Sequence, residues 1–412
     1  MRKTLVGPAL LMLVVLRLSL PFALTYLGDG RLPPNQAQSQ AFTLWAGRVD
    51  HLLIVACLMM SFHSVMNYPR LRGKQFRVSA TVLLLFVPYL TAAIYNGQSP
   101  SWRLAIVGLV VLGLGASANS ISDHALAITA SVPLLLSLPL LLLQPGAIWF
   151  GDRTATGWRS VRLAGSMEQP NVLAAYCGLA IVIAFVGSIP RRPRVIVIAI
   201  NIAALALTAS YTTIIATFLT IYLLRRRGVR WRSAVAVIII SLGAVIRIGS
   251  GDYLPSNRQQ VWKYVGSHWS ESTIWGHGPT YWQSKLAAQD IPTWMVHAHN
   301  QVLESLMITG LVGCAIIGVI FALTVRSSIR AAIQGDRLLL ALVVYSTVRA
   351  VTEVPLTFVF FGNGAFLLAL FVVAASRGLP SKDVRGSAPR DERADWRRTA
   401  LSDASARTTY ER

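Results

Sequence analysis

Residues 297–323 read HAHNQVLESLMITGLVGCAIIGVIFAL, and this stretch decides the class of fold. A long polar stretch, residues 249–298, ends where the apolar segment begins. From Gln301 onward the residues stay apolar for about the 20 positions that a membrane-spanning helix needs, and Glu304 is the one charged residue among them. The sequence therefore predicts a transmembrane helix, with His299 at the boundary between membrane and water.

The composition of the whole chain agrees with a membrane protein. Its 412 residues are 54% hydrophobic and 13% charged, whereas soluble proteins carry about 25% charged residues. The apolar residues come in long blocks rather than at amphipathic spacing, which indicates an all-α polytopic membrane protein. Cys57, Cys177 and Cys314 all lie within apolar blocks, so the sequence indicates neither a disulfide framework nor a metal site.

The apolar blocks predict about twelve transmembrane helices. An even number of helices puts both termini on one side of the membrane. Most basic residues of the connectors fall on that same side, which the positive-inside rule makes cytoplasmic. We place the spans at 5–27, 45–66, 76–96, 102–118, 124–143, 170–188, 194–209, 211–224, 233–248, 300–323, 337–354 and 356–376.

The formal net charge of +21 first suggests nucleic acid or acidic lipid as a partner. The basic residues crowd into short connectors, as in Arg225-Arg226-Arg227, so we expect them to set topology and not to bind nucleic acid. No small-residue cleavage site follows the first apolar block, which predicts a retained span rather than a signal peptide. We expect a transmembrane domain at 1–376 and, because 377–412 has almost no large apolar residues, a disordered basic cytoplasmic tail there.

The connector 249–298 is predicted to be a large extracytoplasmic loop carrying short interfacial helices. Tryptophan prefers the headgroup layer, and this loop holds Trp262, Trp269, Trp275, Trp282 and Trp294. Ser256 and Gln259 match a capping box, so a helix is expected to begin there and to lay its apolar stripe on the membrane. Arg258 falls in its first turn, where free N–H groups and a guanidinium suit a phosphate. Alternatively, Arg258 only reaches toward lipid headgroups.

Two further groups of residues offer chemistry. The run His297-Ala298-His299-Asn300 places a base at the membrane boundary, although a histidine there is commonly just a satisfied polar residue. No carboxylate or cysteine accompanies the two histidines, which disfavours a metal pair. Arg349 and Glu353 lie near the outer end of a predicted span, where charges are normally paired or functional. They can form an intrahelical pair, and Glu353 can also orient a histidine.

Several motifs, taken together, carry a resemblance to a known family. They are Gly165 with Pro170-Asn171 and Ala174; Asn257-Arg258 with Trp262; Trp275-Gly276-His277-Gly278; His299-Asn300 with Gly310 and Gly313; and Thr352-Glu353. Over about 165–355 the chain resembles the O-antigen ligase-related family, which contains O-antigen ligases, O-antigen polymerases and O-oligosaccharyltransferases. The loop and the histidine block are the specific part of this resemblance.

The resemblance implies a twelve-helix protein of the bacterial plasma (inner) membrane that transfers a glycan from a polyprenyl-diphosphate carrier, with no cofactor and no metal. The acceptor is a hydroxyl group of a glycan, a lipid or a protein. His299 takes the position of the catalytic base and Arg258 that of the diphosphate-binding arginine. We add Glu353 to the catalytic residues. The expected substrate-binding set also contains Arg349, Asn300, Asn171, Tyr211 and Trp262.

One position departs from the family pattern. Members often carry Ser-Arg between the seventh and eighth spans, where this chain has Ser210-Tyr211. A second cation for the diphosphate would then come from Arg349, Arg162 or Arg48. The rival interpretation is a twelve-helix secondary transporter, which is disfavoured because the large polar loop occurs only in the second half of the chain.

Overall fold

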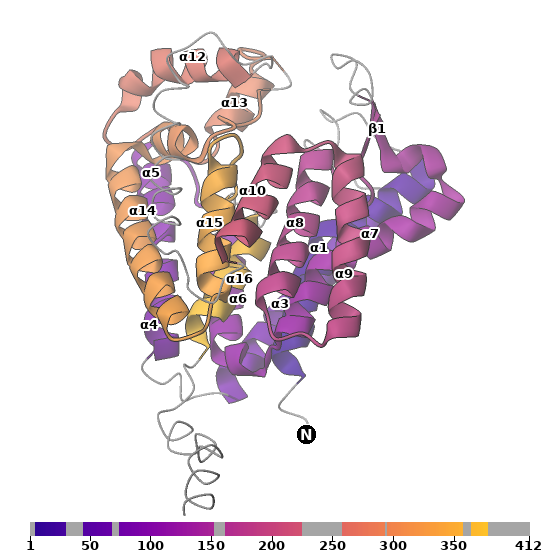
Figure 1. Cartoon of the computed structure of the whole chain (residues 1–412). Coiled ribbons are helices and arrows are strands. Elements are labelled where there is room, and N and C mark those ends of the chain that lie inside the picture. Colours follow the sequence, from indigo (N-terminus) through magenta and orange to yellow (C-terminus); the bar gives the residue numbers. More distant parts are fainter. Residues whose placement is uncertain are drawn as a thin grey trace, which may run out of the picture. The chain divides into compact units, whose positions relative to one another are not determined.

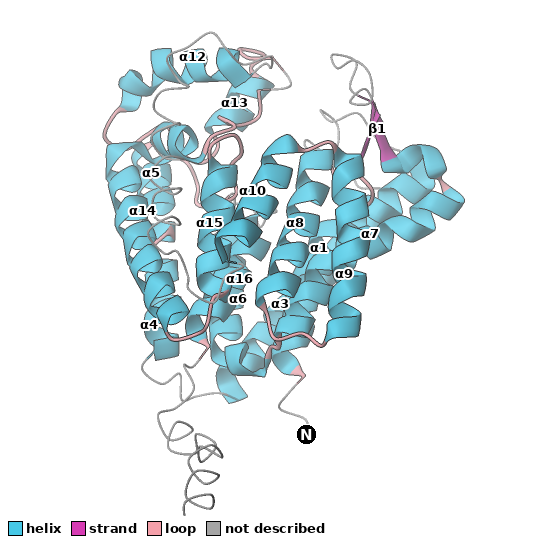
Figure 2. Cartoon of the chain, in the orientation of Figure 1, coloured by secondary structure: helices cyan, strands magenta, loops and turns pink. Residues whose placement is uncertain are grey.

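The computed structural model of the chain describes residues 5–29, 44–67, 74–151, 161–224, 258–292, 295–356 and 364–377. The predicted span 233–248, the loop residues 249–257 and the predicted tail from 378 onward lie outside the described residues. Most of the described chain is helical (Figure 2).

The helices of the described chain are α1 (Val6–Asp29), α3 (Leu44–Asn67), α4 (Lys74–Leu83), α5 (Phe86–Tyr95), α6 (Trp102–Ser117), α7 (Asp123–Leu143), α8 (Pro170–Val186), α9 (Arg191–Thr208), α10 (Tyr211–Leu224), α12 (Arg258–His268), α13 (Tyr281–Ala287), α14 (Gln301–Ile333), α15 (Leu338–Ala350) and α16 (Gly364–Ser376) (Figure 1). Short 3-10 turns are η2 (Ala118–Ser120), η3 (Pro145–Ile148) and η5 (Trp269–Ser272). The strands are β1 (Trp149–Gly151) and β2 (Val161–Leu163).

Six helical segments of the described chain are long and apolar enough to cross a membrane. They are Val6–Gly28, Trp45–Asn67, Arg77–Tyr95, Trp102–Ser120, Asp123–Leu143 and Gln301–Ile333. α8, α10, α15 and α16 are apolar but shorter. These helices agree with the predicted all-α membrane fold, and the total number of spans stays a prediction.

Large apolar side chains are exposed along α3 at helical spacing. In water such a stripe would be an unfavourable patch, whereas lipid tails solvate it. The stripe consists of Trp45, Leu52, Met59, Phe62 and Met66. In contrast, α15 and α16 bury nearly every residue, so they form the centre of the helix packing.

A charged pair joins the first two long helices. The Nε atom of Arg17 on α1 lies 3.0 Å from a carboxylate oxygen of Asp50 on α3, and both side chains are largely buried. Charges inside an apolar helix are costly unless they are paired. This ion pair therefore explains how α1 can contain an arginine and still pack against α3.

The predicted span 76–96 corresponds to the segment Arg77–Tyr95. This segment is interrupted at residues 84–85, between α4 and α5, because Pro88 near the start of α5 has no N–H to continue the hydrogen-bond ladder to Leu84. The predicted connector 144–169 contains a small antiparallel sheet, in which Trp149 of β1 pairs with Leu163 of β2. The all-α prediction did not include this sheet.

α14 is broken at Gly310. This residue has φ 63° and ψ −165°, a conformation that is essentially restricted to glycine. The segment 301–309 is therefore a short helix in its own right, and the longer helix resumes at Leu311. Because the hydrogen-bond ladder is interrupted there, backbone groups on both sides of Gly310 need partners from elsewhere in the chain.

Residues 273–278, between α12 and α13, supply those partners. The N–H groups of His277 and Gly278 donate to the carbonyls of Met307 and Ile308, at 2.8 and 3.0 Å. On the other side of the break, the N–H of Leu311 donates to Thr273 at 2.9 Å. A Cβ atom on Gly276 would lie 2.5 Å from the Gly310 nitrogen, so the two backbones meet where only glycine fits. We call this set of backbone contacts, between residues 273–278 and residues 307–311, the backbone lock.

The apolar stripe of α12 faces the protein and not the membrane. Val261, Trp262 and Val265 are all buried. The prediction that this stripe lies on the membrane is therefore wrong. The helix uses the stripe to cover the polar segment that leads into α14, and α12 and α13 lie over the end of the molecule where α14 begins (Figure 1).

Candidate functional site

The backbone of the histidine segment is held at Ala298. The indole N–H of Trp262 donates to the Ala298 carbonyl at 2.8 Å, and the Ala298 N–H donates to the Glu304 carboxylate at 2.7 Å. The same carboxylate oxygen accepts a second hydrogen bond, from the indole N–H of Trp282 on α13 at 3.0 Å. The carbonyl of Ala298 is therefore hydrogen-bonded to α12, and its N–H is hydrogen-bonded to the first turn of α14.

His299 and Asn300 then make the turn into α14. His299 has φ 49°, in the left-handed region that non-glycine residues rarely adopt. Asn300 caps the helix, because its side-chain oxygen accepts from the N–H groups of Val302 and Leu303 at 2.9 and 3.1 Å. Its amide nitrogen donates to Val351 at 3.0 Å. Asn300, which the sequence placed among the substrate-binding residues, is fully buried and has a structural role here.

The two histidines lie against each other. Their ring centroids are 4.0 Å apart, and the His299 N–H donates to Nδ1 of His297 at 3.1 Å. That bond requires an unprotonated Nδ1, so the proton of a neutral His297 ring is on Nε2. The Nδ1 atom of His299 is buried and has no hydrogen-bond partner in the described chain. A neutral imidazole with an unused nitrogen can accept a proton.

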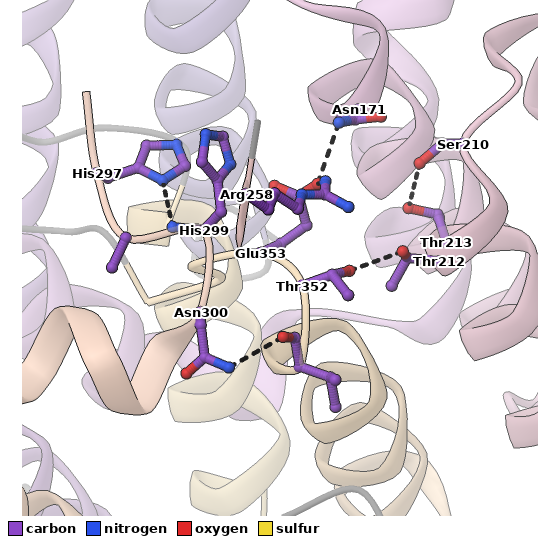
Figure 3. A network of polar contacts seen from close by, with 12 residues as sticks. Asn171, Ser210, Thr212, Thr213, Arg258, His297, His299, Asn300, Thr352 and Glu353 are labelled. Atoms are coloured by element: carbon purple, nitrogen blue, oxygen red, sulfur yellow. Dashed lines mark hydrogen bonds and ion pairs between the residues drawn. The ribbon is translucent and has the colours of Figure 1, made fainter. Parts of the chain in front are cut away.

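An ion pair lies beside the imidazoles (Figure 3). Arg258, the first residue of α12, donates to the Glu353 carboxylate at 2.7 Å, and Asn171 on α8 donates to the same oxygen at 3.0 Å. The arginine and glutamate side chains remain 24% and 13% exposed. Next to Glu353, the hydroxyls of Thr352 and Thr212 lie 2.7 Å apart, which joins this network to α10.

Burial and neighbouring charge keep the imidazoles neutral. Burial lowers the pKa of His299 well below its ordinary value, and His297 and Arg258 lower it further. Burial also lowers the pKa of His297, where Glu353 opposes the effect and Arg258 adds to it. At pH 7 both rings are therefore unprotonated.

The remaining predicted residues lie around this network. Tyr211 begins α10, next to Thr212, and is 46% exposed. Arg349 is buried near the end of α15, where its guanidinium lies over the Tyr345 ring and its Nε has no hydrogen-bond partner in the described chain. Glu353 takes Arg258 and Asn171 as its side-chain partners, so the expected intrahelical pair between Arg349 and Glu353 is not what the structure shows.

The other candidates for a second cation contact aromatic rings. Arg48 on α3 lies over Trp45, and Arg162 on β2 lies over Phe150. Trp262, predicted to bind substrate, is 4% exposed and instead holds the Ala298 carbonyl.

Sequence reasoning missed Glu304 and Trp282 as parts of the site. A signal for Glu304 was present, because it is the one carboxylate in an otherwise apolar helix, and such residues are normally paired or functional. No comparable signal distinguished Trp282 from the other loop tryptophans. Compared with known proteins, the chain matches no family model, and no curated protein matches it significantly in sequence.

Proposed function

We propose that this protein transfers a glycan from a polyprenyl-diphosphate carrier to a hydroxyl acceptor on the outer face of the membrane. The main support is the neutral imidazole of His299, whose Nδ1 has no hydrogen-bond partner among the described residues and which lies in the same neighbourhood as the Arg258–Glu353 ion pair (Figure 3). A base and a diphosphate-binding cation at one site are what such a transfer needs. The motif resemblance to the O-antigen ligase-related family supports the same proposal.

The proposed reaction is a single displacement. The acceptor hydroxyl attacks C1 of the first sugar, the bond from C1 to the diphosphate oxygen breaks, and the diphosphate leaves with the electron pair. His299 accepts the hydroxyl proton. Arg258 neutralises charge on the leaving diphosphate, and the configuration at C1 inverts. Arg349 is the favoured second cation, because its buried Nε has no hydrogen-bond partner among the described residues and Glu353 follows it by four positions.

The proposal includes a topology and an acceptor class. About twelve spans with both termini in the cytoplasm would place α12, α13 and His299 on the outer side of a bacterial plasma membrane. The reaction would be of the polymerase or ligase type, with a glycan, lipid or protein hydroxyl as acceptor. Charge on the diphosphate is assigned to arginines and to the N-terminus of α12, so the proposal has no role for a metal or a cofactor.

A transfer assay with purified protein tests this function. The donor is lipid-diphosphate-linked glycan extracted from the bacterium that makes the protein, and the product is a longer or newly attached glycan. His299→Ala should lose about 10²–10⁴-fold in rate, as is typical for removal of a general base, while still binding the carrier. His297→Ala keeps the base and should lose less.

Two results would contradict the proposed function. The first is a His299→Ala protein that transfers glycan near the wild-type rate. The second is a wild-type protein that moves intact lipid or solute across a vesicle membrane without transferring glycan, which would favour the transporter.

A further inference from the structure

We propose that Glu304 is the positioning residue for the His299 imidazole, an inference that rests on the proposed function. Glu304 itself is buried and has no contact with the Arg258–Glu353 pair among the described hydrogen bonds. It acts through the backbone: it holds the N–H of Ala298, the residue directly before His299. The proposed effect is on the rate of proton transfer and not on binding of the carrier.

The need for such a residue follows from the conformation of His299. A left-handed φ in a residue with a Cβ costs free energy and persists only where the surroundings hold it. On the C-terminal side, Asn300 is fixed as the helix cap. On the N-terminal side, the hydrogen bonds of Ala298 to Glu304 and to Trp262 are what prevents the segment from relaxing.

The position of Glu304 suits this task. It lies in the first turn of α14, where the helix dipole favours a negative charge. One carboxylate oxygen accepts both from the Ala298 N–H and from the Trp282 indole, so α13 helps to fix the rotamer of the carboxylate. The bond from the Ala298 N–H is 2.7 Å long, at the short end of the normal range for such hydrogen bonds.

The substitution Glu304→Ala tests the inference, with two variants for comparison. Loss of the carboxylate frees the Ala298 N–H and lets the imidazole move, and a misplacement of about 1 Å can cost about 10²-fold in rate. We expect kcat to fall by about that factor while KM for the lipid-diphosphate glycan changes little. Glu304→Gln should keep most of the activity, because an amide oxygen can accept the same two bonds. Trp282→Phe removes the bond that helps to fix the Glu304 rotamer but leaves the Ala298 bond, so kcat should fall less than in Glu304→Ala.

A second measurement does not depend on the reaction. Hydrogen exchange of the backbone amides in the peptide that covers 295–300 reports whether the Ala298 N–H is held. Exchange should be faster in Glu304→Ala than in the wild type, Glu304→Gln or Trp282→Phe. If Glu304→Ala does not fold, Trp262→Phe replaces it, since that variant releases the other side of Ala298 and should lower kcat in the same way.

The outcomes separate the inference from the proposed function. A normal kcat in Glu304→Ala or Trp262→Phe, or exchange equal to that of the wild type, overturns the positioning role. A raised KM with unchanged kcat also overturns it, since the residue would then act on binding. A wild-type protein that transfers no glycan contradicts the proposed function, and the exchange experiment still decides whether Glu304 holds the histidine segment.

Discussion

At the scale of single residues, the ion pair between Arg258 and Glu353 determines what an incoming ligand meets. The Arg258 guanidinium is already paired with a carboxylate, so a diphosphate must compete for it. A diphosphate can compete because it has more negatively charged oxygens than a carboxylate and can accept two parallel hydrogen bonds from the guanidinium. The pair therefore keeps the arginine oriented before the ligand arrives.

Arg258→Lys should bind polyprenyl diphosphate much more weakly than the wild type, because an ammonium group cannot reproduce a bidentate contact. Binding of sugar-free polyprenyl diphosphate to the purified protein measures this. Lys263→Ala is the matched control, since it removes an exposed positive charge from the same helix. If Arg258→Ala binds the carrier as well as the wild type does, the diphosphate-binding role is wrong. The alternative, in which Arg258 only extends toward lipid headgroups, would then hold.

The pKa of His299 predicts the pH dependence of transfer. Because burial lowers this pKa, the ring is unprotonated at pH 7 and loses its function only when the pH falls through the lowered value. The profile of kcat/KM, which reports the free enzyme, should therefore decline only well below the ordinary histidine value of about 6.5. The decline of kcat should lie at higher pH, because a bound diphosphate raises the pKa. A decline of kcat/KM at or above the ordinary value would exclude His299 as the base.

At the scale of elements, the backbone lock between residues 273–278 and α14 predicts a strong glycine requirement. Gly310→Ala places a side chain in a conformation that costs about 1–3 kcal/mol, and its Cβ would lie 2.3 Å from the Ile274 carbonyl oxygen. The melting temperature in detergent should fall, and amides 273–278 should exchange faster. Gly318→Ala is the control in the same helix, because nothing lies within 4 Å of its Cβ position. Equal stability of the two variants would contradict the lock.

At the scale of the whole molecule, the prediction concerns the side of the membrane that holds the site. Ser267 is exposed on α12, so Ser267→Cys should react with an impermeant maleimide in intact spheroplasts. Ser387→Cys, in the predicted tail, should react only after lysis. The wild type measures the background, since Cys57 and Cys177 are buried and Cys314 is half-buried. The reverse pattern of labelling would invert the proposed topology.

Hydropathy located the described long helices because each apolar block is a local property of the sequence. Local patterns also singled out Arg258, His299 and Glu353, which the structure brings into one neighbourhood (Figure 3). What no local pattern contains is the pairing between distant residues. Arg258 and Glu353 are 95 positions apart, and the break at Gly310 depends on where Gly276 lies in space. For the same reason the apolar stripe of α12 was assigned to lipid when it covers the protein.

The backbone lock has a consequence for the order in which the protein is made. Residues 273–278 leave the ribosome before α14 does, so the segment that supplies partners to the broken helix already exists when Gly310 emerges. Without it, the carbonyls of Met307 and Ile308 would enter the bilayer with no partner, and each such group costs several kcal/mol there. Assembly of this helix therefore depends on prior placement of residues 273–278 beside it. A chain in which that segment is held elsewhere should stall at this step and be exposed to proteolysis during biogenesis.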